Sequence, residues 1–327
     1  MAFKILLPQP IMESGMKYLL NHGFEVVVGN GFTEEDIIRD IKGCDAMIVR
    51  TAKITRRIIE AADKLKVMAR HGAGFDGVDL EAAKEKGIMV LYAPRANSES
   101  VAELALFYML HCSRNFKLVQ KLYKDDYMTA KMKVEKHELN GKTLGLIGVG
   151  NIGGLVAKKA HYGFDMNVVA FDPYAKEVPD YITLAASRDE VFEKADYVSL
   201  HIPATPDTVN SVGAHEFEIM KETAFLINTS RGTVVDEEAL IKALEEKKIA
   251  GAALDVTQKE PINPDNPLLA MDNVLTAPHI GGATKEAASR SSLICAQGID
   301  EFLNGIKPDF PVPPMREQLN AMDLKAK

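Results

Sequence analysis

The sequence has few cysteines, no long apolar run and fewer basic than acidic residues, and each of these shortages argues against a class of protein. Its cysteines, Cys44, Cys112 and Cys295, are scattered without metal-ligand spacing, which predicts reduced thiols and no metal site. No apolar run is long enough to span a bilayer, and the first residues resemble a strand rather than a signal peptide. The net charge of −7 is unfavourable for binding nucleic acid. We therefore expect a cytoplasmic protein with neither a membrane nor a nucleic-acid partner.

What the sequence does contain is a repeated alternation of short β-rich runs and helical patterns. At 327 residues the chain is long for one hydrophobic core and sufficient for two. The first series of predicted strands is FKILL, FEVVV, DAMIV, KVMAR and IMVLY. A long helix over residues 98–116 and a Lys-rich stretch over 117–142, whose lysines we expect to form a solvated face, separate it from a second series. That series is TLGLIGVG, NVVAFD, YVSLHIP, AFLINTS, GAALDV and NVLTAP. The alternation predicts an α/β protein with two doubly wound parallel-sheet domains.

A glycine-rich loop opens the second series. Gly148-x-Gly150-x-x-Gly153 follows an apolar strand and precedes a helical pattern, which is the context that a dinucleotide-binding loop requires. The glycines permit a tight turn, an approach of backbone to a pyrophosphate and close packing of helix on strand. Asp172 ends the next strand, where a carboxylate can bind the ribose hydroxyls, and no arginine follows it to bind a 2′-phosphate. The pattern favours NAD over NADP. A glycine-rich turn with a capping aspartate is the alternative interpretation.

Polar residues stand at the ends of the later predicted strands, where ligands of doubly wound sheets bind. These residues are His201, Thr229, Arg231, Asp255, Glu260 and His279. Oxidation of a hydroxy acid needs a cation for the carboxylate, a base for the hydroxyl proton and a group that orients the base. Arg231, His279 and Glu260 supply these chemistries. Capping or surface roles remain alternatives for Arg231 and Glu260, and structural or cofactor-side roles are equally open for His201 and Asp255.

Six motifs together carry a resemblance to a known family. They are RHGAGFDGVDL, NSESVAEL, ELNGKTLGLIGVGNIGG, INTSRGTVVDEEAL, ALDVTQKEP and APHIGGAT. The motifs occur in the order typical of the D-isomer-specific 2-hydroxyacid dehydrogenases, and the chain resembles this family from about residue 3 to about residue 315. The resemblance implies that Arg231 binds the substrate carboxylate, that Glu260 orients the histidine and that His279 carries the proton.

The resemblance also implies a domain organisation. A flavodoxin-like substrate domain would comprise residues 1–98 and 293–327, and a Rossmann NAD-binding domain residues 99–292, joined by crossing helices. Homodimers would form through the cofactor domain. The implied cofactor contacts are Gly148, Gly150, Asn151, Ile152, Gly153, Asp172, Thr229, Arg231, Asp255, His279 and Gly281. The implied substrate contacts are Arg50, Arg70, Gly72, Ala73, Gly74, Arg231 and His279.

Two further arginines bear on the identity of the substrate. Arg50 and Arg70 stand where phosphoglycerate dehydrogenases carry arginines near the substrate's phosphate, which favours the pair 3-phosphoglycerate and 3-phosphohydroxypyruvate. Surface ion pairs are the alternative role for both arginines. We expect no added C-terminal domain like that of many such enzymes. The sequence also has no tryptophan before ELNGKT, and it has Ala73, Phe75 and Gly77 where relatives often differ.

These departures keep other substrates and one other class of protein open. Hydroxypyruvate, glyoxylate and sulfonated three-carbon acids remain alternative substrates. NAD-sensing corepressors of the same family are the alternative of a different class. Formate dehydrogenases have glutamine at the position of Glu260, which argues against that assignment.

Overall fold

In the computed structural model, which describes residues 2–327, the chain divides into two compact units. The first unit contains the residues up to Asn97 together with Gly282–Lys327, and the second contains Ser98–Gly281. Each unit has its own parallel sheet, so the predicted α/β class with two such sheets is confirmed. Across the described part of the chain, no helix is both long and apolar enough to cross a membrane.

The sheet of the first unit consists of the five strands expected from the apolar runs. They are β1 (Lys4–Leu7), β2 (Glu25–Val28), β3 (Ala46–Val49), β4 (Val67–Arg70) and β5 (Met89–Tyr92). The spatial order β2-β1-β3-β4-β5 is the flavodoxin-like order, and neighbouring strands pair in parallel. The central strands are buried along their length, which explains why they appear in the sequence as continuous apolar runs.

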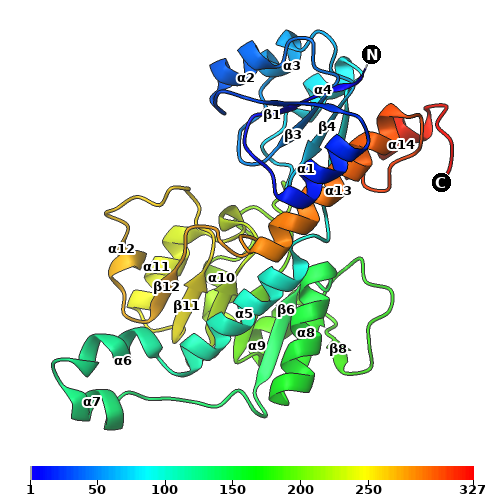
Figure 1. Cartoon of the computed structure of the whole chain (residues 1–327). Coiled ribbons are helices and arrows are strands. Elements are labelled where there is room, and N and C mark those ends of the chain that lie inside the picture. The colour runs from blue at the N-terminus through cyan, green and yellow to red at the C-terminus, as the bar shows by residue number, and fades with distance from the viewer. Residues whose placement is uncertain (1) are drawn as a thin grey trace. The chain divides into compact units, whose positions relative to one another are not determined.

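Helices cover both faces of this sheet. They are α1 (Glu13–Asn21), α2 (Glu34–Asp40), α3 (Arg56–Ala61), α4 (Leu80–Glu85), α13 (Lys285–Leu303), α14 (Arg316–Asn320) and the 3₁₀ turn η2 (Pro313–Met315). α1 and α13 lie side by side (Figure 1). They approach closely at Gly15, where a Cβ atom would lie 2.5 Å from the carbonyl oxygen of Ser292. The predicted domain change at residue 293 falls inside α13, all of which packs in the first unit.

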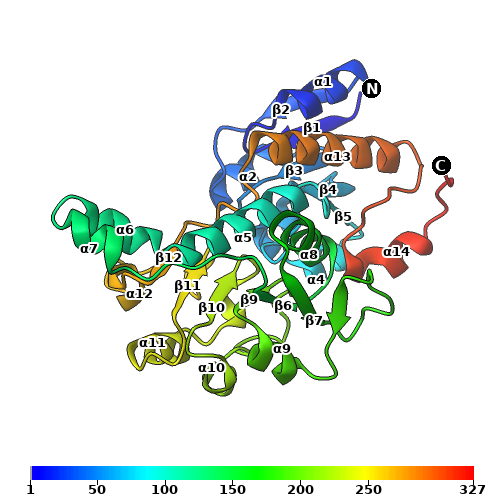
Figure 2. The ribbon, with the colours of Figure 1, turned by 90° about the horizontal axis from the view of Figure 1, so that it is seen from below.

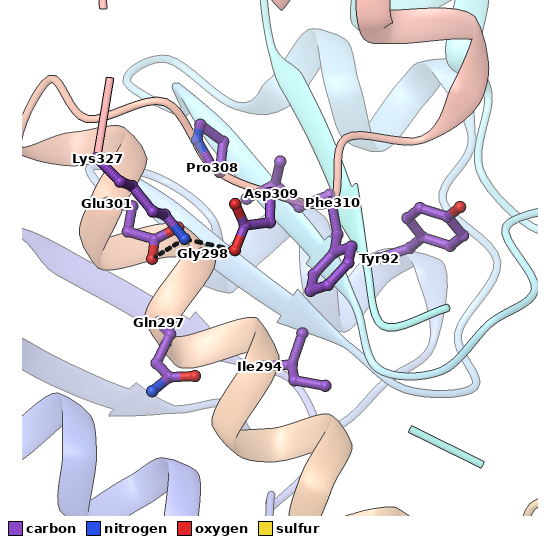
Figure 3. Close-up of a pocket in the computed structure, with 10 residues that line it drawn as sticks. Tyr92, Ile294, Gln297, Gly298, Glu301, Pro308, Asp309, Phe310 and Lys327 are labelled. Carbon is purple, nitrogen blue, oxygen red and sulfur yellow. Dashed lines mark hydrogen bonds and ion pairs between the residues drawn. The ribbon is translucent and has the colours of Figure 1, made fainter. Parts of the chain in front are cut away.

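After α13 the chain returns to the edge of the same sheet. The amide of Tyr92 donates to the carbonyl of Phe310 at 3.0 Å, and the amide of Val312 donates to Val90 at 3.0 Å. Residues 309–312 therefore lie antiparallel along β5 and cover its open edge. The same tail, α13 and β5 border a cavity of about 190 Å³ (Figure 3). At its rim the ammonium of Lys327 binds Glu301 at 2.7 Å and Asp309 at 2.5 Å.

The sheet of the second unit has seven parallel strands. They are β6 (Thr143–Ile147), β7 (Asn167–Phe171), β8 (Ile182–Leu184), β9 (Tyr197–Leu200), β10 (Phe225–Asn228), β11 (Gly251–Leu254) and β12 (Val274–Thr276). Their order is β12-β11-β10-β9-β6-β7-β8, a Rossmann order whose direction of winding reverses between β6 and β9. Sequence patterns did not predict β8, because this edge strand has only three residues and two of them are exposed.

Two layers of helices enclose this second sheet (Figure 2). α5 and α8 pack on one face, and α9, α10 and α11 line the other. The helices of the unit are α5 (Ser98–Ser113), α6 (Phe116–Tyr123), α7 (Tyr127–Met132), α8 (Asn151–Phe164), α9 (Arg188–Lys194), α10 (Ala214–Ile219), α11 (Glu237–Glu245), α12 (Pro267–Ala270) and the 3₁₀ turn η1 (Gly232–Val234).

The helix predicted over residues 98–116 is wrong at its end. α5 stops at Ser113, and Asn115 adopts a left-handed conformation with φ of 47° before α6 begins. The Lys-rich stretch then forms the α6–α7 hairpin at the periphery of the unit (Figures 1 and 2). Lys117 donates to the carbonyls of Met271 at 2.7 Å and Val274 at 2.8 Å, so this lysine is engaged by backbone.

Candidate active site

The glycine loop lies between β6 and α8, and each of its three glycines has a different environment. Gly148 has φ of +94°, and a Cβ atom there would lie 2.6 Å from the carbonyl oxygen of His201. A Cβ atom at Gly153 would lie 2.1 Å from the carbonyl oxygen of Gly148, so α8 can approach the loop only with glycine at this position. At Gly150, by contrast, no described atom lies within 4 Å of the Cβ position. The loop backbone is therefore open on the side where a pyrophosphate would bind, at the N-terminus of the 14-residue helix α8.

The carboxylate of Asp172 is held beside this loop. Its Oδ2 atom accepts a hydrogen bond from the amide of Val149 at 2.9 Å, and its Oδ1 atom accepts one from the amide of Tyr174 at 2.9 Å. An ionised carboxylate offers about four acceptor sites. The carboxylate of Asp172 therefore keeps acceptor capacity for the hydroxyls of a ribose.

Two buried polar atoms continue the row of strand ends from Asp172 and the glycine loop. Thr229 follows β10 and His201 follows β9, and β10, β9, β6 and β7 are neighbours in the sheet. The Oγ1 atom of Thr229 and the Nδ1 atom of His201 are buried without a hydrogen-bond partner among the described residues. Buried polar atoms are nearly always paired in native proteins, so these two atoms mark a place for a polar ligand. The cradle fits an extended dinucleotide such as NAD.

The loop after β10 is shaped by the side chain of Asn228. Its Oδ1 atom accepts from the amide of Ser230 at 3.0 Å and from the hydroxyl of Ser230 at 2.8 Å, while its Nδ2 atom donates to the carbonyl of Arg231 at 3.0 Å. Gly232 lies directly against Thr257, because a Cβ atom there would be 1.9 Å from the carbonyl oxygen of Thr257. Arg231 is thereby placed beside the segment that leads to Glu260.

Glu260 and His279 form a hydrogen-bonded pair. The Nδ1 atom of His279 lies 2.9 Å from the Oε2 atom of Glu260, and the two side chains are 49% and 42% exposed. Because a carboxylate only accepts, Nδ1 carries the proton and Nε2 is left as the atom that can take a proton. His279 itself has φ of 55°, in a region that non-glycine residues seldom occupy and that is common at functional sites.

Asp255 supports the loop that carries His279. Its carboxylate is 2% exposed and accepts hydrogen bonds from the amides of Ile280 and Gly281, both at 2.8 Å. The hydroxyl of Tyr108 lies 3.4 Å from the same carboxylate. Burial, followed by the charge of Asp255, raises the pKa of Tyr108 above its usual value, so this hydroxyl remains a donor. No sequence pattern indicated Tyr108, which is one apolar residue among many in α5.

A pocket of about 510 Å³ adjoins the pair. It is lined by Thr257, Glu260, Pro261, Ile262, Thr276, Ala277, Pro278 and His279. The lining is mostly apolar, with the carboxylate and the imidazole as its charged or titratable groups. Pro261, Ile262 and Pro278 were not expected at the site.

The substrate contacts expected from the resemblance in the glycine-rich loop Gly72–Gly74, together with Arg50 and Arg70, belong to the first unit. Arg50 follows β3 and Arg70 ends β4, and these strands are neighbours. The guanidinium of Arg50 donates to the carbonyl of Pro10 at 2.8 Å, and that of Arg70 donates to the carbonyl of His71 at 2.6 Å. The expected cofactor contacts and the three expected catalytic residues all belong to the second unit. Their roles stay predictions.

Comparisons with known proteins agree with this geometry. Residues 106–281 match the family model of the D-isomer specific 2-hydroxyacid dehydrogenase, NAD binding domain, so the second unit contains an NAD-binding domain. The chain is 44% identical over 306 residues to a D-3-phosphoglycerate dehydrogenase of Methanocaldococcus jannaschii, covering 92% of this chain and 58% of the relative. It is 38% identical over 291 residues to a hydroxypyruvate reductase of Thermotoga maritima, covering 88% and 94%.

The solved structures give the same likeness. The holo form of a D-mandelate dehydrogenase of Rhodotorula graminis superposes with a TM-score of 0.87 at 26% identity, covering 96% of this chain and 98% of that one. The chain spans less than two thirds of the length of the first curated relatives, both of which are named D-3-phosphoglycerate dehydrogenase.

The environment of His201 predicts a loss of stability in acid. Burial lowers the pKa of His201 to about 4 from its usual 6.5. Below pH 6.5 the unfolded chain gains a proton that the folded chain does not, so stability falls as the pH drops from 6.5 towards 4 and is unaffected above that window. The contribution is about 3 kcal/mol. In denaturant titrations at pH 7 and pH 4.5, His201→Gln should lose less stability between the two values than the parent. An equal loss in both proteins would contradict the assignment.

Proposed function

The chain belongs to the D-isomer specific 2-hydroxyacid dehydrogenase family, and on that premise we propose that it interconverts a D-2-hydroxy acid and a 2-oxo acid with NAD. The observation that carries the proposal is the hydrogen-bonded pair of Glu260 and His279 in the same unit as an NAD-binding domain. A neutral imidazole with its Nδ1 proton directed to a carboxylate is suited to accept a proton at Nε2.

The proposed mechanism assigns one task to each residue. Arg231 binds the substrate carboxylate through its planar guanidinium and polarises the oxygen on C2. His279 takes the hydroxyl proton at Nε2, and Glu260 stabilises the imidazolium that forms. A bound NAD⁺ would supply the hydride acceptor for the hydrogen on C2. In the reverse direction His279 returns the proton to the oxygen as the 2-oxo acid is reduced.

The cofactor site is proposed to favour NAD over its 2′-phosphorylated form. Asp172 lies beside the glycine loop, and its negative charge would repel a 2′-phosphate. The neighbouring Tyr174 is 90% exposed and offers no positive charge to offset that repulsion.

The substrate we propose carries a second anionic group, as 3-phosphohydroxypyruvate does. Arg50 and Arg70 end neighbouring strands of the first sheet and supply two cations at its carboxyl edge, where ligands of such sheets bind. Several relatives are named D-3-phosphoglycerate dehydrogenase, which supports this choice. Others are named hydroxypyruvate reductase and glyoxylate reductase, and these unphosphorylated acids are the alternative.

A homodimer formed through the second unit is part of the proposal. Large apolar side chains are exposed along α5, α6 and α7, namely Phe107, Leu110, Phe116, Tyr123, Tyr127, Met128 and Met132. α6 has no fully buried residue, and its side chains Phe116 and Tyr123 are exposed. Exposed apolar surface of this extent is typical of a protein interface, and a second copy of the chain is the partner we propose.

The acid–base role of His279 is tested by His279→Ala. Loss of the proton acceptor should lower kcat by about a hundredfold or more, the usual scale of general base catalysis. The melting temperature of the variant should stay close to that of the parent, which checks that the variant is folded. His215→Ala is the matched control, because His215 also pairs with a carboxylate at 3.0 Å in the same unit. Near-normal turnover of His279→Ala would remove the residue from the mechanism.

The substrate is tested by initial rates with 3-phosphohydroxypyruvate and with hydroxypyruvate. The phosphorylated acid should have the higher kcat/KM, and Arg50→Ala should reduce that preference by about tenfold or more, the scale of a charged hydrogen bond. Arg57→Ala is the control, since Arg57 is exposed and bound to Glu34 at 2.6 Å. Equal rates for the two acids in the parent would mean that Arg50 and Arg70 do not bind a phosphate of the substrate. The proposed dehydrogenase function would be unaffected by that result. No turnover of either acid, followed by none with a panel of 2-oxo acids, would contradict the function itself.

The dimer is tested by light scattering after size-exclusion chromatography. The parent should have twice the mass of one chain, and Tyr123→Glu combined with Met132→Glu should yield a monomer, because burying two carboxylates at an apolar interface is unfavourable. Tyr162→Glu, at a similarly exposed position on α8, should leave the dimer intact. A parent that elutes as a monomer at micromolar concentration would refute the proposal.

A further inference from the structure

His71 forms an unexpected link between the end of β4 and helix α13. Its Nε2 atom lies 2.8 Å from the hydroxyl of Ser292 and 3.1 Å from the carbonyl of Ala288. The hydroxyl of Ser292 also accepts a hydrogen bond of 3.0 Å from the amide of Met12, at the start of α1. The imidazole therefore joins the end of β4 to α13, and Ser292 in turn joins α13 to the start of α1.

The proton on the ring is assigned by its partners. The carbonyl of Ala288 can only accept, so Nε2 of His71 carries a proton and donates it towards α13. Burial, followed by the positive charge of Arg50, lowers the pKa of His71 to about 4. At neutral pH the ring is uncharged, and its contribution at this position is a directed hydrogen bond rather than a third positive charge beside the two arginines.

The contact secures the segment that contains the expected substrate residues. The amide of Gly72 donates to the carbonyl of Arg70 at 2.9 Å, so the chain turns at His71 itself. The carbonyl of Gly72 accepts from Ala93 at 2.9 Å, and Gly72 has φ of +142°, which favours glycine. Beyond the loop, the ring of Phe75 meets that of Tyr92 edge to face at 5.7 Å. The Gly72–Gly74 loop is thus held at both ends, and His71 is its anchor on the helix side.

Resting on the function proposed above, we propose that His71 is a positioning residue for substrate binding, whose contact with Ala288 and Ser292 holds Arg70 and the Gly72–Gly74 loop in the arrangement that binds the acid. A loop of glycine and alanine has no side chains with which to fix itself, and glycine loses the most conformational freedom on ordering. The cost of ordering the loop is therefore lowered by fixing its ends before the substrate arrives.

The test compares KM and kcat in three variants with the 2-oxo acid that the parent reduces best. His71→Leu removes the hydrogen bonds at similar volume and should raise KM for the acid by about tenfold with little change in kcat, the scale expected for one or two neutral hydrogen bonds. His71→Gln keeps an N–H group that can reach the same carbonyl and should restore KM to within about threefold of the parent. His22→Leu is the matched control, because His22 also bonds a carbonyl of the first unit, that of Tyr18 at 2.8 Å.

A second test substitutes Ser292, the residue to which His71 is hydrogen-bonded. Ser292→Ala should also raise KM, and its effect should add less than fully to that of His71→Leu, because the two residues share one contact. If His71→Leu does not fold, Ser292→Ala decides the question by the same criteria. The melting temperature and the dissociation constant of NADH are measured for each variant, and both should stay close to those of the parent.

Two results would overturn the inference. One is an unchanged KM in folded His71→Leu. The other is an equal loss of kcat, NADH affinity and melting temperature in the Leu and Gln variants, which would indicate a structural role alone. A parent that reduces no 2-oxo acid would instead refute the proposed function, and with it this inference. The parent's own turnover therefore separates the two failures.

Discussion

The buried carboxylate of Asp255 is the interaction on which the geometry of the proposed site depends. A charge removed from water is tolerated only where donors surround it. Here the donors are two consecutive amides, those of Ile280 and Gly281, with the hydroxyl of Tyr108 nearby. These bonds fix the backbone directly after His279, and the amide of His279 itself donates to the carbonyl of Asp255 at 2.8 Å. The left-handed conformation of His279 is maintained by this set of bonds, and the direction of its imidazole towards Glu260 follows from it.

A similar use of a carboxylate occurs at the other end of the same sheet edge. Asp172 binds the amide of Val149 and so ties the end of β7 to the glycine loop after β6. In both places an acidic side chain at the end of one strand orders the loop beside it. The parallel arrangement brings these loops to one edge of the sheet, where ligands of doubly wound sheets bind.

Much of the fold was predictable because buried parallel strands appear in the sequence as short apolar runs between turn signals. β8 was missed since a three-residue edge strand has no such run, and the end of α5 was missed because the left-handed Asn115 interrupts a pattern that otherwise continues. The glycine loop with Asp172 was predictable because its residues are close in sequence. Each glycine also meets a requirement of the local backbone, for a tight turn or a close approach. The pairing of Glu260 with His279 was expected from their positions after neighbouring strands and from the family resemblance.

The rest of the site depends on contacts that sequence patterns do not contain. Tyr108 looks like an ordinary apolar residue of α5 until the fold brings its hydroxyl beside Asp255. The bond from His71 to Ser292 joins residues 221 positions apart. The predicted boundary at residue 293 differed from the division of the structure for a similar reason, because a continuous helix gives no local sign of the unit in which it packs.

The tail that covers β5 has a consequence for how the molecule meets its neighbours in solution. Open parallel sheets present two rows of unpaired amides and carbonyls, and each row is a template on which another chain can add a strand. Residues 309–312 occupy the row along β5, so strand addition to the first sheet is confined to β2. There the side chains of Glu25 and Val28 are exposed, and the charge of Glu25 sits beside Lys4 at 3.3 Å. The first sheet is therefore closed to strand addition along β5, and β2 is the edge that stays open to it.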